Sequence, residues 1–333
     1  TKTSKGVFKQ TDRENSLIHL MRVNLLKRME SSINSFSLTV SKLLQNNIQL
    51  LEMIDSHSNT EIEEMNIIDI DIESDKYADQ LIGKNVKVLL SDIDKIMLKQ
   101  DLTNDINKLQ ELYDASIQID DTKDKKLLTL KENIFEKVNN PINENNKKVI
   151  IFTAFADTAQ YLYENISRWA KTNLEIESCL ITGSGINKST LYPKERDLNT
   201  LLTHFSPISK DRGKIDTEAT KEIDILIATD CISEGQNLQD CDYLINYDIH
   251  WNPVRIIQRF GRVDRLGSKN NSIQLVNFWA NMELDEYINL ESRVSGRMVL
   301  LDISATGEEN VIDTSNKEMN DLSYRAKQLK ELQ

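Results

Sequence analysis

The sequence predicts an α/β chain in two parts: an α-helical region over residues 1–140, and a parallel sheet with helices on both faces over 141–310. Two observations lead to this expectation. Apolar residues in the first part recur at helical spacing, and short apolar runs in the second part alternate with helical stretches. Between the parts, residues 139–146 are rich in Asn and contain Pro141, the first proline of the chain. A helical tail is expected over 311–333.

The first part is expected to contain three helical stretches. Apolar residues keep helical spacing from Leu17 to Leu44, and similar stretches cover 87–112 and 123–138. Between the first two, residues 52–75 carry nine carboxylates and no Lys or Arg. A run of like charge is typical of a solvated loop or helix edge. We therefore expect antiparallel helices with an acidic connection.

The second part is expected to form the sheet. Its candidate strands are 149–153, 177–181, 225–229, 243–247 and 273–278, with helical stretches notably at 158–171 and 193–205. Strands that alternate with helices form parallel sheets, and such sheets bind ligands at the carboxyl ends of their strands. This rule selects Thr153, residues 182–184, residues 229–237 and Asp248 as the positions where a site should lie.

Composition narrows the class of protein. Charged residues make up 28% and hydrophobic residues 39% of the chain, as in a soluble globular protein. No apolar run approaches the roughly 18 residues that cross a bilayer, so we expect no membrane partner. The three cysteines form no C-x-x-C pair, which argues against a disulfide framework or a metal site and favours the cytoplasm. The net charge of −12 argues against indiscriminate binding to phosphate backbones, although a local basic cleft can act within an acidic whole.

The strongest functional signal is the segment 258–265, Gln-Arg-Phe-Gly-Arg-Val-Asp-Arg. It follows Asn252-Pro253, a pair that favours the start of a helix, and we expect the helix to end at Gly267. Gln258, Arg262 and Arg265 are spaced i, i+4 and i+7, which predicts one shared face.

Guanidinium groups match phosphate oxygens, and Gly261 leaves room for a neighbouring backbone or ligand. A polyphosphate site is one interpretation of this face. A cationic face that pairs with the acidic surplus elsewhere is equally compatible with this segment alone.

A second segment favours the phosphate interpretation. Residues 228–238, Ala-Thr-Asp-Cys-Ile-Ser-Glu-Gly-Gln-Asn-Leu, directly follow an apolar strand. Together with 258–265 they resemble motifs V and VI of superfamily-two helicases, and residues 150–155 resemble motif IV. The runs 234–239, 246–248 and 251–253 resemble the Swi/Snf-type ATPases, closest to a bacterial branch that includes the RNA-polymerase-recycling ATPase. Residues 20–32 resemble the helical region that this branch carries between its two motor lobes.

This resemblance implies a RecA-like C-terminal motor lobe. Arg262 and Arg265 would face the γ-phosphate of ATP, with Arg265 the better arginine-finger candidate. Gln258 would help to position the nucleotide, and Gly235 and Asn237 would approach it. Many relatives have an acidic residue where this chain has Asn237, which puts a ribose contact there in doubt.

The resemblance also implies a nucleic-acid track. Thr153 and Thr229 occupy positions where family members touch the nucleic-acid backbone, and Thr182, Gly183 and Ser184 resemble a further turn of this kind. Contacts to the backbone position the track without reading its sequence. The expected partner is double-stranded DNA, with RNA polymerase or another nucleoprotein as a further partner.

The other half of a motor site is missing from these residues. Residues 183–189 lack the second glycine of a P-loop, and Asp285-Glu286 does not follow an apolar strand. We therefore expect ATP and Mg²⁺ to be held mainly by an N-terminal lobe outside this sequence, and this chain alone to hydrolyse almost no ATP. Two alternatives stay open. The first is an RNA or strand-separating helicase, which is less favoured because DEAD-type RNA helicases usually have His where this chain has Gln258. The second is a non-catalytic interaction scaffold.

Overall fold

The computed structural model describes residues 10–56, 61–62, 88–89, 95–183, 187–192, 197–215, 221–232, 236–249, 253–265 and 267–279. The chain divides into two compact units, Thr1–Leu130 and Lys131–Gln333, and the boundary falls inside the helix Lys125–Asn139. The sequence places this boundary about ten residues later, at the Asn-rich segment. The predicted tail over 311–333 lies outside the described residues. Within the described part of the chain, no helix is both long and apolar enough to cross a membrane.

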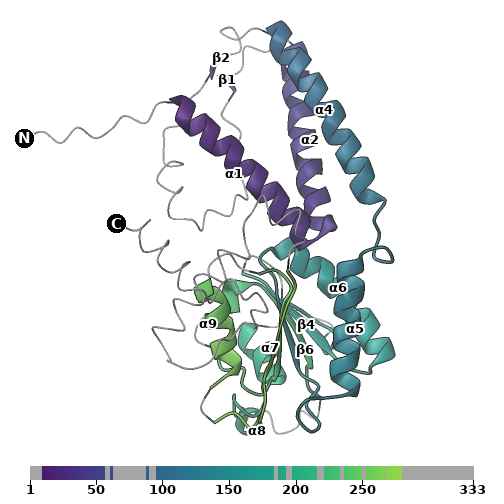
Figure 1. Cartoon of the computed structure of the whole chain (residues 1–333), viewed down its shortest axis with the longest axis vertical. Helices are drawn as coiled ribbons and strands as arrows, with labels where there is room; N and C mark the ends of the chain where they lie inside the picture. Colours follow the sequence, from purple (N-terminus) through teal and green to yellow (C-terminus); the bar gives the residue numbers. More distant parts are fainter. Residues whose placement is uncertain are drawn as a thin grey trace, which may run out of the picture. The chain divides into compact units, whose positions relative to one another are not determined.

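The first unit is built from long helices. They are α1 (Gln10–Ser31), α2 (Ile33–Asp55), α4 (Lys95–Ile117) and the start of α5 (Lys125–Asn139), with a short antiparallel pair of β1 (Glu61–Ile62) and β2 (Val88–Leu89). α2 packs along α4 through Leu102 and Ile54, and Lys99 at the start of α4 pairs with Asp55 at the end of α2 at 2.6 Å. The two helices therefore run antiparallel, as expected (Figure 1).

The stretch that the periodicity joins between Leu17 and Leu44 is broken at Ser32. This residue has extended backbone (φ −155°), and its hydroxyl accepts a hydrogen bond from the Ser35 amide, so it caps a new helix. Arg28 donates to the Ser35 hydroxyl at 3.1 Å from the other side of the break. Apolar spacing does not report such a break, because the polar cap decides it.

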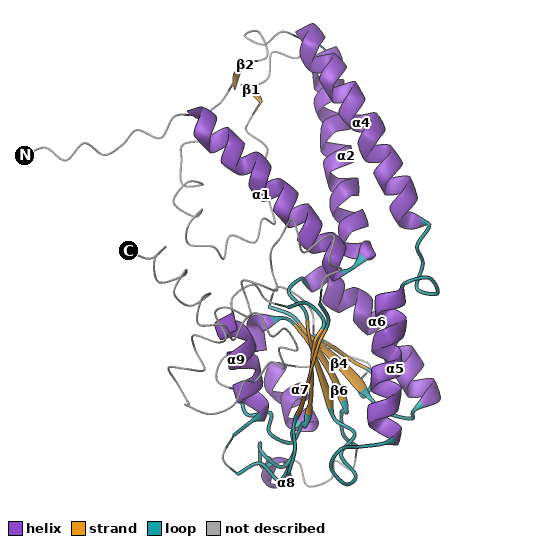
Figure 2. Cartoon of the chain, in the orientation of Figure 1, coloured by secondary structure: helices purple, strands orange, loops and turns teal. Residues whose placement is uncertain are grey.

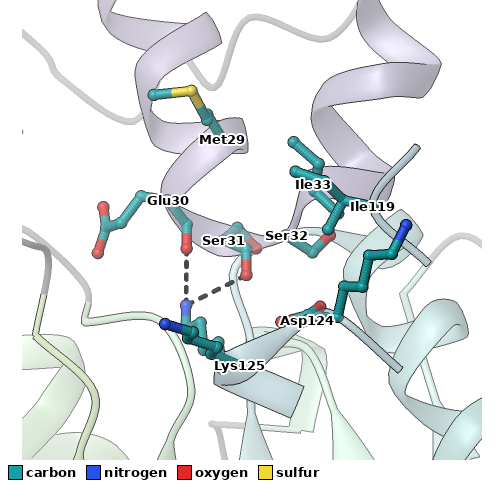
Figure 3. A pocket seen from close by; sticks show the side chains of 10 residues that line it. Met29, Glu30, Ser31, Ser32, Ile33, Ile119, Asp124 and Lys125 are labelled. Atoms are coloured by element: carbon teal, nitrogen blue, oxygen red, sulfur yellow. Dashed lines mark hydrogen bonds between the residues drawn. The ribbon is translucent and has the colours of Figure 1, made fainter. Parts of the chain in front are cut away.

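A cavity of about 240 Å³ lies at this break, lined by residues of α1, α2, the segment between α4 and α5, and the start of α5 (Figure 3). On its floor, the Lys126 ammonium donates to the carbonyls of Glu30 and Ser31 at 2.7 and 3.1 Å. These carbonyls lie at the C-terminal end of α1, so the positive charge of the lysine also complements the helix dipole. The lining thus already has a structural role.

The second unit contains a six-stranded sheet in the order β5-β4-β6-β3-β7-β8. All neighbours run parallel except the edge strand β5, which is antiparallel to β4. The five predicted strands are all present, each within one or two residues of its expected ends, and the two-residue β5 was not predicted. The strands are β3 (Val149–Phe152), β4 (Ser178–Ile181), β5 (Lys188–Ser189), β6 (Ile225–Ala228), β7 (Tyr243–Asn246) and β8 (Gln274–Asn277).

Helices cover both faces of the sheet, which confirms the predicted fold class (Figure 2). α7 (Leu198–Phe205) and α9 (Pro253–Val263) lie on one face, where Phe205 and Val263 join a core with alternate residues of the four inner strands. α6 (Ala156–Asn173) packs on the opposite face through β4. The helix predicted from 193 begins at Leu198, behind the capping side chain of Asp197, and residues 193–196 lie outside the described part. A short helix, α8 (Arg212–Ile215), precedes β6.

A buried polar network holds the amino ends of the central strands. Lys137 of α5 and Asp242, just before β7, form an ion pair at 2.7 Å in which both side chains are fully buried. Asn143 donates to the other oxygen of Asp242 at 2.8 Å, and Lys137 also donates to the Asn146 carbonyl at 2.9 Å. Because a buried charge requires such partners, this end of α5 is part of the sheet-bearing unit.

Candidate functional site

Three positions that the strand rule selected follow the carboxyl ends of neighbouring strands. β6, β3 and β7 lie side by side in the middle of the sheet, and Thr229, Thr153 and Asp248 follow them. The ladder continues one step beyond the strands, since the Thr153 amide donates to Ala228 and the Tyr247 amide to Phe152. The carboxyl ends of these three strands, which the strand rule selected, therefore form one continuous surface.

Arg259 is the residue that joins these strand ends, and the sequence patterns did not predict a role for it. Its side chain is fully buried. Its guanidinium donates to both oxygens of Asp230 at 2.6 and 2.8 Å, and to the Asn246 side chain at 2.9 Å. It also lies 5.0 Å above the ring of Phe152. One side chain of α9 thus contacts β3, β7 and the turn after β6.

The fork of arginine explains why this residue type is here. A planar guanidinium can bind a carboxylate with two parallel hydrogen bonds and still stack on an aromatic ring, whereas an ammonium cannot. Asp230 is in the short 3-10 turn Asp230–Ile232, which directly continues β6. The spacing of Gln258, Arg262 and Arg265 pointed to a different side of the helix, and such a spacing cannot indicate a buried partner for Arg259.

Thr153 lies beneath the surface of this edge. Its side chain is fully buried, and its hydroxyl donates to the Asp248 carboxylate. The same carboxylate oxygen accepts the Ala154 amide at 3.1 Å. Thr153 and Asp248 therefore fix the turn after β3 to the turn after β7. A nucleic-acid contact at this turn stays a prediction, and the Thr153 side chain supports the turn instead of facing outward.

The helix ends earlier than predicted, which separates the two candidate arginines. α9 stops at Val263, with a last helical hydrogen bond from the Asp264 amide to Phe260. Near this end of the helix, the Arg262 carbonyl accepts the Leu238 amide at 3.0 Å. The predicted shared face of Gln258, Arg262 and Arg265 is therefore wrong for Arg265. Arg262 is half-buried on α9, and Arg265 is exposed beyond its end.

The turn after α9 requires Gly267. This residue has φ +90°, a conformation that side chains with a Cβ rarely adopt. Its position matches the predicted end signal, although the helix itself has already stopped four residues before it. The chain then returns along the loop before β7, where the Asn270 side chain donates to the Gln239 carbonyl at 3.0 Å.

Two of the predicted nucleotide-binding residues present buried acceptors without partners. The Asn237 Oδ1 and Gln258 Oε1 atoms are buried and accept no hydrogen bond from any described residue. Such atoms are uncommon in folded proteins, and each requires an explanation such as a missing ligand. Gln258 is half-buried on α9, and Asn237 precedes the Leu238 amide that caps the same helix. Gly235, the other residue predicted to approach the nucleotide, lies outside the described residues.

The two predicted backbone-contacting turns are neighbours. β4 and β6 pair in parallel, and the Thr229 amide continues that ladder to the Ile181 carbonyl at 3.2 Å. A Cβ added to Gly183 would lie 3.1 Å from the Cβ of Cys231, so a glycine lets the two turns approach. Burial raises the pKa of the Cys231 thiol. Thr182 and Gly183 thus lie next to the turn that starts at Thr229, and Ser184 is outside the described residues.

The part of the chain that contains this site is similar to known helicases. Residues 125–267 match the helicase conserved C-terminal domain. The match starts at the first residue of α5, ends at Gly267 and covers less than half of the chain. It contains the edge formed by β6, β3 and β7, and all of α9. We call this part the helicase-like domain below.

Individual relatives match shorter stretches. The uncharacterized ATP-dependent helicase YqhH of Bacillus subtilis is 43% identical over 67 residues, which is 20% of this chain and 12% of that protein. The probable ATP-dependent RNA helicase ddx51 of Dictyostelium discoideum is 27% identical over 179 residues, 53% of this chain and 28% of that protein. The chain therefore spans well under two thirds of the curated relatives that it matches.

Solved structures give weaker similarities. The C-terminal part of the Fun30 ATPase domain aligns with 85% of this chain and 85% of that chain, at 15% identity and a TM-score of 0.36. Dbp5 of S. cerevisiae bound to RNA and ADP BeF3 aligns with 51% of this chain and 36% of that chain, at 18% identity and a TM-score of 0.33.

Proposed function

We propose that the helicase-like domain is the C-terminal lobe of an ATP-driven motor that moves along double-stranded DNA. The observation that carries this proposal is the placement of α9. Arg259 fixes the helix at the carboxyl ends of β6, β3 and β7, and the unpartnered oxygens of Gln258 and Asn237 lie on or beside it. A helix that bears arginines at a ligand-binding sheet edge suits recognition of a polyphosphate.

The residues present fit one side of an ATP site. The amide oxygens of Gln258 and Asn237 need donors, and hydroxyl and amino groups of a nucleotide can supply them. Arg262 and Arg265 would neutralise negative charge on the phosphates, and Gly235 would allow close approach of the backbone. ATP bound there with Mg²⁺ would supply the energy of phosphoryl transfer. These roles are proposals for this chain.

The remaining half of the site would come from a lobe with a P-loop. That lobe would hold Mg²⁺ and the β- and γ-phosphates, while the helicase-like domain brings its arginines across the cleft. ATP binding would close the two lobes, and hydrolysis would reopen them. Alone, residues 1–333 should show almost no ATP turnover, because half of the catalytic groups are missing.

The track would lie along the turns after β4 and β6. Thr182, Gly183, Ser184 and Thr229 are proposed to touch the phosphate backbone, while Thr153 joins the turn after β3 to the turn after β7 through Asp248. A strongly acidic chain can bind nucleic acid in this way if the contacts are local. We expect the protein to work in the cytoplasm, with RNA polymerase or another nucleoprotein as the obstacle that it moves against.

A second candidate is an RNA helicase, because ddx51 and DBP8, two of the relatives, are RNA helicases by name. Gln258 and the Asn-Leu-Gln run at 237–239 favour the Swi/Snf-type branch instead. ATP turnover by the native protein, that is, the full-length protein with the proposed P-loop lobe, should be measured with duplex DNA, single-stranded DNA and RNA. The strongest stimulation by duplex DNA supports the translocase, and stimulation by RNA alone would replace it with the RNA helicase.

The arginine roles are tested by Arg262→Ala and Arg265→Ala in the native protein. Each should lower nucleic-acid-stimulated ATP turnover by about 10³-fold, since an arginine at the transferring phosphoryl group accelerates the reaction by that order. Nucleic-acid binding should be largely preserved.

The matched control is Arg168→Ala, which removes an exposed arginine from α6 on the other face of the sheet. Its turnover should equal that of the wild type. If Arg265→Ala also keeps wild-type turnover, the arginine-finger assignment of Arg265 is wrong, and the same holds for Arg262.

A further inference from the structure

We propose that Arg259 and Asp230 form a positioning clamp that couples the nucleic-acid turn after β6 to the helix that bears Gln258 and Arg262. This inference rests on the proposed function and adds a pair of residues to it. Neither residue needs to touch ATP or nucleic acid. The pair would set the orientation of α9 according to the position of the turn.

The first basis of the clamp is its geometry. Arg259 binds Asp230 through two parallel hydrogen bonds, and its third nitrogen donates to the Asn246 side chain and, at 3.3 Å, to the Asp248 carbonyl. The guanidinium is completely enclosed, while the Asp230 side chain is 18% exposed. A bidentate pair fixes both distance and direction, so the turn and the helix share one orientation.

The second basis is the position of Asp230 in the chain. It directly follows Thr229, the residue proposed to touch the track, and it opens the 3-10 turn that contains Cys231. On the helix, Arg259 directly follows Gln258 and lies one turn before Arg262. A displacement of the turn therefore reaches both candidate nucleotide contacts through a single buried side chain.

The same loop also holds the far end of the helix. The Leu238 amide donates to the Arg262 carbonyl at 3.0 Å, nine helical residues after Pro253 starts α9. The loop that leaves β6 thus binds α9 at Arg259 through Asp230 and at Arg262 through Leu238. With two attachments, the turn cannot shift along the helix unless the ion pair breaks or the helix moves with it.

The clamp predicts a loss of coupling when the fork is broken. Arg259→Lys keeps the charge but cannot make two parallel bonds, and Asp230→Asn keeps the shape but removes the charge. In the native protein, the ratio of nucleic-acid-stimulated to unstimulated ATP turnover should fall about tenfold in each variant, within the usual range of coupling between two sites. The double variant should resemble the single ones, because both remove the same interaction.

The matched control breaks another arginine–carboxylate pair of the same unit. Arg212 of α8 bonds to Glu222 at 3.2 Å before β6, at the opposite edge of the sheet. Arg212→Lys should leave the stimulation ratio unchanged. Thermal unfolding of every variant is measured as well, and Asp230→Asn keeps the test open if Arg259→Lys does not fold.

The outcomes separate a coupling role from a purely structural one. A structural role lowers the melting temperature and reduces both turnover rates in proportion, so the ratio stays at the wild-type value and the clamp is overturned. A reduced ratio in folded Arg259→Lys or Asp230→Asn protein, with additivity absent in the double variant, supports it. If the wild-type protein itself shows no nucleic-acid-stimulated ATP hydrolysis, the proposed function fails first, and that result is recognised before any variant is compared.

Discussion

Arginines of one helix have different environments, and the difference decides what each can do. Arg259 is enclosed and pairs with Asp230. Arg262 is half-buried, and its backbone carbonyl accepts the Leu238 amide. Arg265 is exposed beyond the end of the helix. A buried arginine with satisfied donors holds structure in place, because its removal leaves a charge without a partner. An exposed arginine keeps its donors for a ligand. Sequence spacing singled out Arg262 and Arg265 and did not indicate the buried role of Arg259.

The Asp224 carboxylate, at the amino ends of the central strands, allows a test of how burial affects a single charged residue. Burial raises the pKa of Asp224 above its ordinary value of 3.8, although Lys148, at 4.0 Å, acts in the opposite direction. The folded state therefore holds this proton more tightly than the unfolded chain. The stability contributed by protonated Asp224 is present below the ordinary pKa and is lost as the pH rises through the raised value.

Asp224→Asn should consequently stabilise the protein more at neutral pH than at acidic pH, because burial disfavours the ionised carboxylate and the amide carries no charge. Urea unfolding of both proteins at neutral pH and near pH 3.5 measures this difference. The same charge change at exposed Glu132, Glu132→Gln, should have little effect at either pH. A variant less stable than the wild type at pH 7 would contradict the burial argument.

At the scale of elements, apolar runs predicted the sheet well. All five parallel strands were found from runs such as 225–229, because buried parallel strands are apolar on both faces. The edge strand Lys188–Ser189 was not found, since it is two residues long and polar. Strand ends then located the candidate site, because the carboxyl ends of neighbouring parallel strands must meet at one edge.

Helix ends were harder to predict, for physical reasons that can be named. Ser32 breaks a continuous apolar pattern because its hydroxyl caps a new helix, and α9 stops at Val263, next to an Arg262 carbonyl that accepts the distant Leu238 amide. Tertiary hydrogen bonds of this kind leave no periodic trace in the sequence. For the same reason the bonds of Arg259 and Thr153 became visible only in the structure.

α9 itself supplies a prediction in which stability and activity separate. A Cβ added to Gly261 would meet no heavy atom within 4 Å, and the residue lies inside the helix. Gly261→Ala should therefore stabilise the protein by about 0.5–1 kcal/mol, the difference in helix propensity between the two residues. If Gly261 leaves room for a ligand or a partner lobe, nucleic-acid-stimulated ATP turnover should fall in the same variant.

The comparison is Gly213→Ala in α8, where the added Cβ also meets nothing within 4 Å. That variant should change stability slightly and leave turnover unchanged. Chemical denaturation and the ATPase assay are run on the same preparations. Full turnover by Gly261→Ala would show that the open space beside α9 is not used.

In the whole molecule, the boundary between the two units falls within α5, so that each unit contains part of this helix. The sequence pattern placed the change at the Asn-rich segment, because composition shifts there. Packing places it earlier, since Lys137, Ile134 and Val138 of α5 are buried, and Lys137 is bound to Asp242 of the sheet-bearing unit. The Asn-rich composition indicates a turn in the chain, whereas the buried Lys137–Asp242 ion pair indicates that α5 and the sheet fold together.

The ion pair makes the minimal folded fragment predictable. A fragment of residues 125–333 keeps Lys137, whereas one of residues 141–333 leaves the fully buried Asp242 charge without it. Removing one partner of a buried pair destabilises by about 3–5 kcal/mol, against a total stability of about 5–15 kcal/mol for a domain. The shorter fragment also loses the buried Ile134 and Val138 side chains. It should therefore unfold at much lower urea concentration than the longer one, or not fold at all.

Lys137→Met in the longer fragment isolates the ion pair and should reproduce a large part of the loss. Equal stability of the two fragments would mean that α5 is a linker and that the boundary lies at residue 141 after all.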